Sequence, residues 1–217
     1  MVSLAPHAAN ATFAQATQTA IVEGSNTMPI TLPKRKPLIP LELLYKPNGK
    51  LPANLLHTYT PGTGQLTGRA LWWFTVLKNE AAKAGFQLTY TPGGCYRTYA
   101  QQYNLFLSRY EPCSFAVWLI TPTSRRKTWN ENSQNKYWRK KLINGSYPAT
   151  AAVPGYSNHG LALSVDLALG AKPSEAKSLT VAAINWLVAN APKYGIYAES
   201  DAEPWHWSYA LGDKNPA

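Results

Sequence analysis

Cysteine is scarce in this sequence, and long apolar runs are missing from it. Two cysteines among 217 residues permit one disulfide and require none, and they are too few for a metal site built on thiolates. No stretch of about 18 apolar residues occurs, which excludes a transmembrane helix. The apolar content of 45% is nevertheless enough for a sizeable core, so we do not expect a disordered chain.

Acidic residues are also few. The 11 Asp and Glu stand against 21 Lys and Arg, which gives a formal net charge of +10. Such an excess predicts attraction to a polyanion, either nucleic acid or an anionic wall or membrane surface. The basic residues cluster at 34–36, 125–127 and 139–141, with no zinc-finger, basic-zipper or RNA-recognition signature beside them. We interpret these clusters as solvated loops and expect no nucleic-acid partner.

The N-terminal part has its own composition. It lacks a basic segment before its apolar residues, and His7 and Asn10 interrupt them, so it is a poor signal peptide. Residues 33–64 carry six prolines, a density that forbids a long helix. We expect residues 1–64 to form an extended arm that docks on partner subunits, and residues 65–217 to form the folded domain.

Hydrophobic periodicity predicts an α+β domain. Apolar residues recur at helical spacing between 66 and 81, and Gly85 stands where that helix would end. Residues 111–150 are polar and basic, and we expect a long, partly ordered excursion near a binding surface. The other predicted elements are strands over 86–91, 162–169, 194–198 and 205–209, a helix from the cap Thr98 to Arg109, and a helix that starts at Ser174. Helices first and several strands later are typical of the α+β class.

Two of the four histidines lie in unusual local sequences. His159 opens a segment that ends at Asp166, and His206 follows Glu203 by three residues. A catalytic zinc takes three imidazole or carboxylate ligands, and it lowers the pKa of a water in the fourth position from about 16 to about 7. His159, Asp166 and His206 supply three such ligands, and Glu203 supplies a carboxylate to take and return the proton. An ionised Asp166 in an apolar strand is costly without a cation, so the two motifs together favour a metal site.

These motifs resemble a known family. Ser-x-His with an Asp seven residues after the His, and Glu-x-Trp-His later in the chain, are the pattern of zinc D,D-carboxypeptidases of the VanY and VanX type. The L-alanyl-D-glutamate peptidases of phage endolysins are similar. Arg97 with Gln102 five residues later matches a third element, an Arg that opens a helix. The likeness spans about residues 66–210, and the segment before Ser157 is most similar to versions in phages of actinobacteria.

The resemblance implies both a fold and a set of roles. The fold is a VanY/hedgehog-like peptidase, a small antiparallel sheet with helices packed on it and zinc in a cleft at the sheet. The implied roles are zinc binding by His159, Asp166 and His206, general acid and base catalysis by Glu203, oxyanion stabilisation by Arg97, and substrate or supporting contacts by Gln102 and Ser157. The chain departs from the family at Ala162 and Ser164, where relatives carry Gly and Ala. Both departures add atoms to a tight segment beside the metal.

The implied reaction is hydrolysis of an amide bond in the peptide stem of bacterial peptidoglycan. The bond stays open between D-Ala-D-Ala, L-Ala-D-Glu and a cross-link. Because the N-terminus is a poor signal peptide and no wall-binding module is evident, we expect a virion-associated enzyme whose arm docks on other phage tail proteins. The alternatives are an endolysin, a host D-Ala-D-Ala carboxypeptidase at the cell wall, and a structural tail-tip protein with a vestigial peptidase fold.

Overall fold

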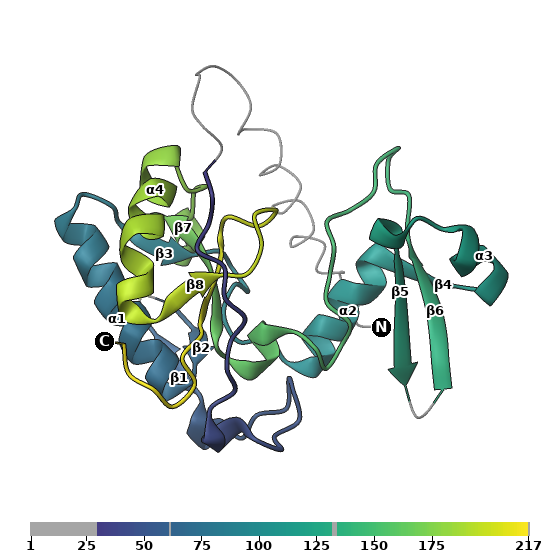
Figure 1. Cartoon of the computed structure of the whole chain (residues 1–217), viewed down its shortest axis with the longest axis horizontal. Coiled ribbons are helices and arrows are strands. Elements are labelled where there is room, and N and C mark those ends of the chain that lie inside the picture. Colours follow the sequence, from purple (N-terminus) through teal and green to yellow (C-terminus); the bar gives the residue numbers. More distant parts are fainter. Residues whose placement is uncertain (1–29, 61, 132–133, 217) are drawn as a thin grey trace, which may run out of the picture. The chain divides into compact units, whose positions relative to one another are not determined.

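The computed structural model describes residues 30–60, 62–131 and 134–216, and the side chains of these except for 130, 131, 134 and 135. These residues divide into two compact units. The larger unit contains residues 30–108 and 152–216, and the smaller unit contains residues 109–151 (Figure 1). Within the described part of the chain, no helix is long and apolar enough to cross a membrane.

A four-stranded antiparallel sheet forms the centre of the larger unit. Its strands run in the order β3-β7-β9-β8, so that β7 and β9 are the central pair. Val165 and Leu167 of β7 and Trp207 of β9 point to a fully buried face. The bounds are β3 Leu88–Tyr90, β7 Ser164–Leu169, β8 Ile196–Ala198 and β9 His206–Tyr209.

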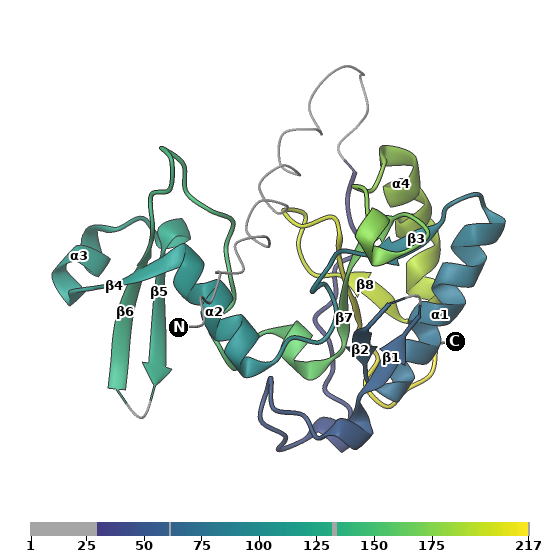
Figure 2. The same ribbon diagram turned by 180° about the vertical axis from the view of Figure 1, so that it is seen from behind.

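Helices cover the buried side of this sheet. α1 (Gly68–Lys83) buries Ala70, Phe74, Leu77 and Ala81, which recur at the spacing of one helix face. α4 (Val181–Asn190) buries Ile184 and Leu187 in the same core. The two helices lie on the same side of the sheet in both ribbon views (Figures 1 and 2). α2 (Tyr99–Arg109) leads from the larger unit into the smaller one.

The described part of the arm lies on the larger unit as extended chain. Backbone hydrogen bonds join Arg35 and Pro33 to Ala198, so the chain runs beside the edge strand β8. Leu32, Leu43 and Leu51 are buried in the core, whereas Leu38, Ile39, Leu41 and Leu44 stay exposed. A short hairpin of β1 (His57–Tyr59) and β2 (Gly64–Leu66) follows. Short 3-10 helices occur at Leu41–Leu43, Ala53–Leu55, Thr123–Arg125, Asn158–Leu161, Pro173–Glu175 and Ala191–Tyr194.

The smaller unit has its own antiparallel sheet. The strand order is β4-β6-β5, and β5 and β6 form a hairpin that both ribbon views show (Figures 1 and 2). Trp129 and Trp138 are buried together on one face, and on α3 Phe115 and Trp118 contact Tyr137. The bounds are β4 Tyr110–Cys113, α3 Phe115–Ile120, β5 Arg126–Glu131 and β6 Gln134–Lys140.

The expected α+β class, with helices on a small antiparallel sheet, is confirmed. The prediction that a helix starts at Ser174 is wrong. Residues 173–175 form only a 3-10 turn, and α4 begins after Thr180, whose hydroxyl accepts a hydrogen bond from the Ala183 backbone N–H. Residues 1–29 of the expected arm lie outside the described residues, and the boundary between 64 and 65 stays a prediction.

Candidate metal site

Strand register places two of the predicted ligands side by side. Asp166 of β7 pairs with His206 of β9, and Ser164 pairs with Ser208 two positions along. Because side chains alternate along a strand, these two pairs share one face of the sheet, opposite the face that Val165 and Trp207 bury. His206 Nδ1 lies 2.9 Å from Asp166 Oδ1 as a result.

The third predicted ligand comes from the segment just before β7. His159 lies in the 3-10 helix Asn158–Leu161, which ends at Ala162 in a left-handed conformation with φ 54°. This turn sends the chain into β7 and leaves His159 Nε2 3.3 Å from Asp166 Oδ1. The two imidazole rings meet edge to face at 4.8 Å between centroids.

These three side chains form a donor set that fits a zinc-type ion. One ligand atom from each lies within 4.8 Å of the others. Two imidazole nitrogens and one carboxylate oxygen are the ligands that catalytic zinc sites use. The ring nitrogens that face away from Asp166 also have partners, which orient the rings. His159 Nδ1 lies 2.9 Å from the Cys95 carbonyl, and His206 Nε2 lies 2.9 Å from Glu199 Oε1. Each ring therefore presents its other nitrogen to Asp166.

The electrostatics of the metal-free cluster are those of a tight ion pair. Burial alone raises the pKa of Asp166, but the charge and hydrogen bonds of His159 and His206 hold that pKa well below its ordinary value. Burial alone lowers the pKa of His206, but hydrogen bonds and charge from Asp166 and Glu199 outweigh it and raise the pKa to about 10. The carboxylate is therefore ionised and ready to accept a cation at neutral pH.

Arg97 and Gln102 lie beside the cluster and contact each other. Arg97 Nη1 donates to Gln102 Oε1 over 2.8 Å, and Gln102 Nε2 donates to the Ala152 carbonyl over 2.6 Å. The Arg97 backbone N–H binds the His159 carbonyl, and its Nη2 lies 4.0 Å from Asp166 Oδ2. The guanidinium, which is 18% exposed, is thus fixed at the edge of the site.

Glu203 and Ser157 are placed less directly. Glu203 is half-buried in the turn before β9, where its carbonyl accepts a hydrogen bond from the His206 backbone N–H. Within the described residues, its carboxylate makes no hydrogen bond or ion pair. Ser157 is buried, and its carbonyl accepts from Asn48 Nδ2 and Gly160 N. The catalytic and substrate roles of both residues stay predictions.

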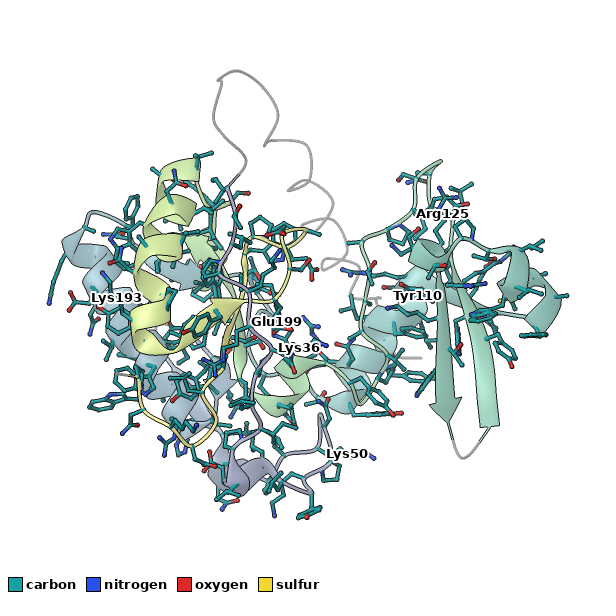
Figure 3. All side chains as sticks on the ribbon, viewed as in Figure 1. Lys36, Lys50, Tyr110, Arg125, Lys193 and Glu199 are labelled. Atoms are coloured by element: carbon teal, nitrogen blue, oxygen red, sulfur yellow. The ribbon has the colours of Figure 1, made fainter. Side chains whose placement is uncertain are left out.

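Glu199 is a site residue that the sequence analysis missed. It directly follows β8, and Figure 3 labels it. Its carboxylate contacts His206 Nε2, Asn158 Nδ2 at 2.7 Å and the Ser208 hydroxyl. Burial raises the pKa of Glu199, but these partners, His206 foremost, outweigh burial and lower it.

Both departures from the family pattern have a structural setting. Ala162 takes the left-handed conformation that glycine adopts freely. The Ser164 hydroxyl lies 2.5 Å from the hydroxyl of Ser208, and both side chains are fully buried. The two cysteines, Cys95 and Cys113, are free thiols.

Comparison with solved structures gives several distant neighbours. A VanY D,D-pentapeptidase mutant from a VanB-type resistance cassette, solved with Zn(II), has a TM-score of 0.46 and 18% identity, with 82% of this chain and 86% of that chain covered. VanYB in complex with D-Ala-D-Ala has a TM-score of 0.46 and 18% identity, with 83% of this chain and 85% of that chain covered. The LD-carboxypeptidase LdcB has a TM-score of 0.42 and 20% identity, with 70% of this chain and 67% of that chain covered. No curated protein sequence matches the chain.

The family model is the finding that assigns the chain. A model described as VanY, D-alanyl-D-alanine carboxypeptidase, matches residues 64–213, which is more than half of the sequence. That range contains all the residues of the metal cluster, together with Arg97, Gln102 and Glu203. The chain belongs to the VanY family of D-alanyl-D-alanine carboxypeptidases.

Proposed function

We propose that this protein is a zinc peptidase that hydrolyses an amide bond in the peptide stem of bacterial peptidoglycan. The observation that carries the proposal is the convergence of His159, Asp166 and His206 on one point, with ligand atoms within 4.8 Å. The family match over residues 64–213 supports the peptidoglycan substrate. Within that class we favour the D-Ala-D-Ala bond, because it is the bond that the family is described by; L-Ala-D-Glu and a cross-link are the alternatives.

The residues around the metal cluster divide the chemistry between them. Zinc held by His159, Asp166 and His206 would acidify a water molecule and polarise the carbonyl of the scissile bond. Glu203 then takes the proton from the attacking water and returns it to the leaving amine. Arg97 donates to the carbonyl oxygen as negative charge develops on it, which in a water-poor site is worth about 3 kcal/mol for one good donor.

Gln102 has a supporting part in this scheme. Its amide oxygen accepts from Arg97 Nη1, while its amide nitrogen is held by the Ala152 carbonyl. Gln102 is buried, so this chain of two hydrogen bonds restrains the guanidinium without solvent competition. Arg97 is therefore oriented before substrate arrives, which lowers the reorganisation needed in the transition state.

The proposal is tested with Glu203→Gln, which keeps the shape of the side chain and removes the base. Purified sacculi are digested and the muropeptides are analysed by mass spectrometry, which also identifies the bond that is cut. We expect zinc content equal to wild type and loss of cleavage by at least about 10²-fold. Cleavage that persists in a zinc-loaded variant refutes the base. A wild-type protein that binds zinc but leaves sacculi intact favours a structural protein with a vestigial peptidase fold.

We further propose that the protein is carried on a phage virion, at the tail. The exposed apolar side chains of Leu38, Ile39 and Leu41 on the arm support this location, because they suit packing on a neighbouring subunit. Mass spectrometry of purified particles tests it. Detection in lysates but never in particles contradicts the proposal and favours an endolysin.

A further inference from the structure

The two histidines of the cluster have different partners at their outer ring nitrogens. His159 donates from Nδ1 to a neutral backbone carbonyl, that of Cys95. His206 instead has the carboxylate of Glu199 2.9 Å from its Nε2. Glu199 lies outside both metal motifs, seven residues before His206, so the motifs alone give it no role.

We propose that Glu199 is the positioning residue of His206: it fixes the imidazole with Nε2 protonated and Nδ1 free to bind the metal. This inference rests on the proposed zinc site. A neutral imidazole carries its proton on either nitrogen, and without an acceptor behind Nε2 the proton is drawn to Nδ1, where Asp166 Oδ1 lies 2.9 Å away. That tautomer blocks the nitrogen that faces the cluster. Glu199 offers the competing acceptor that favours the productive tautomer.

The carboxylate is itself held on both oxygens. Asn158 Nδ2 donates to Oε2 over 2.7 Å, and Ser208 Oγ donates to Oε1, the oxygen that faces His206. The Ser208 hydroxyl has a single proton, which it donates to Glu199. In the contact between the two serines, Ser164 is therefore the donor and Ser208 the acceptor. The chain of hydrogen bonds therefore runs from Ser164 through Ser208 to Glu199 and ends at His206.

This chain of hydrogen bonds is built by the sheet. Ser164 and Ser208 are directly paired across β7 and β9, and both are fully buried. Ala198, the last residue of β8, pairs with Trp207, so Glu199 continues the strand opposite His206. Glu199 is 22% exposed and His206 13%, so water competes little for the contact. Apolar side chains would be enough to pack this strand pair, and buried hydroxyls need hydrogen-bond partners. Restraint of Glu199 gives the two buried hydroxyls a role.

The charge of Glu199 acts in the same direction. An anionic carboxylate within hydrogen-bond distance of Nε2 makes the imidazole a stronger ligand for a cation at Nδ1. Loss of a partner of this kind typically lowers metal affinity by 10- to 100-fold.

The test compares Glu199→Ala and Glu199→Gln with wild type, and uses Glu175→Gln as a matched control. Glu175 lies on the surface of the same unit, and within the described residues its carboxylate pairs with Lys172, 3.1 Å away. Zinc affinity is measured by competition with a chelator. We expect a 10- to 100-fold loss for Glu199→Ala, a smaller loss for Glu199→Gln, whose amide oxygen still accepts from Nε2–H, and no change for the control. Equal affinity of Glu199→Ala and wild type overturns the proposal.

A second readout separates positioning from a merely structural role. A ring that binds zinc through Nδ1 carries its proton on Nε2 in every variant, so ¹⁵N NMR of the zinc-loaded protein is used to measure how fast that proton exchanges with water. We expect slow exchange at His206 in wild type and in Glu199→Gln, and fast exchange in Glu199→Ala. Equally slow exchange in Glu199→Ala means that Glu199 does not hold the ring, and the proposal is wrong. Should Glu199→Ala not fold, Glu199→Gln decides alone: a loss of zinc affinity with slow exchange retained supports the proposal, and unchanged affinity overturns it.

Metal-free protein distinguishes this inference from the proposed function. A wild-type chain that binds no zinc refutes the zinc site. In that case the Nε2–H resonance of His206 still reports on Glu199. A slowly exchanging Nε2 proton in wild type that is lost in Glu199→Ala supports the contact, and its absence from wild type overturns it.

Discussion

Zinc binding is expected to displace a proton from His206. In the metal-free protein, the Nδ1 and Nε2 atoms of this ring each lie 2.9 Å from a carboxylate oxygen, of Asp166 and Glu199 respectively. Burial lowers the pKa of His206, but the two carboxylates raise it to about 10. At neutral pH the ring therefore carries a proton on the nitrogen that faces the cluster, and the metal must replace it.

The size of the effect follows from that pKa. At pH 7 the proton is bound about three pH units below its pKa, which at 1.36 kcal/mol per unit opposes zinc by about 4 kcal/mol. The apparent association constant should then rise about tenfold for each pH unit between 6 and 8. The same proton stabilises the metal-free fold. Because the folded pKa lies above the ordinary value of 6.5, that stabilisation is complete below pH 6.5 and is lost as the pH rises towards 10.

Isothermal titration calorimetry measures the proton directly. Titrations at pH 6.5 in two buffers of different ionisation enthalpy should give about one proton released per zinc bound, and chelator competition from pH 6 to 8 gives the slope. A flat affinity over this range, with proton release near zero, would mean that His206 is already neutral and that the carboxylates do not hold its proton.

Three further outcomes are expected. Arg97→Ala should lower kcat/KM by about 10²- to 10³-fold in a muropeptide assay, because one oxyanion donor is lost; zinc content that fell in parallel would instead place Arg97 among the supports of the metal. The pKa values of Asp166 and Glu199 are lowered in the fold, so the stability they give is present above their ordinary pKa values and is lost as the pH falls through the lowered ones. Urea unfolding of metal-free protein at pH 6 and pH 3 should show this loss, and equal stability at both would contradict it. Ser208→Ala should lower the free energy of unfolding by about 1–3 kcal/mol, since a buried hydroxyl and a carboxylate lose a partner, and adding Ser164→Ala should recover part of it; a double variant less stable than the single one argues against the shared hydrogen bond.

The elements with strong periodicity were predictable from the sequence. The helix over 66–81 corresponds to α1, and the strand over 162–169 contains β7, because each buries one regular set of apolar side chains. Thr98 was also predicted as a helix cap, and its hydroxyl accepts from the Gln101 backbone N–H. The start of α4 was missed because Ser174 follows Pro173 and imitates a helix start, whereas the cap that forms is Thr180.

Residues 109–151 were harder to predict. We expected a partly ordered excursion, whereas the described residues of the segment form three strands and a helix. Trp129 and Trp138 share one face of the small sheet with Lys127 and Lys136, so apolar and polar residues do not alternate along β5 and β6. The segment therefore lacks the pattern that indicates a strand in a sequence.

The metal cluster could be predicted as a set of residues, and Glu199 could not. His159, Asp166 and His206 are marked by motif spacing, so the sequence alone groups them. The roles assigned to them, to Glu203 and to the substrate-contacting residues stay predictions. Glu199 reaches His206 only through the pairing of β8 with β9, and the register of two strands is a long-range property that no local spacing encodes.

Hydrogen bonds join the two ends of the smaller unit. The chain enters it at Arg109, the last residue of α2, and the Arg109 guanidinium binds the carbonyls of Ala149 and Thr150, where the segment ends. An insert whose first and last residues are joined by hydrogen bonds brings its own two ends together. We expect such a segment to tolerate changes in sequence and length while β7 and β9 keep their pairing.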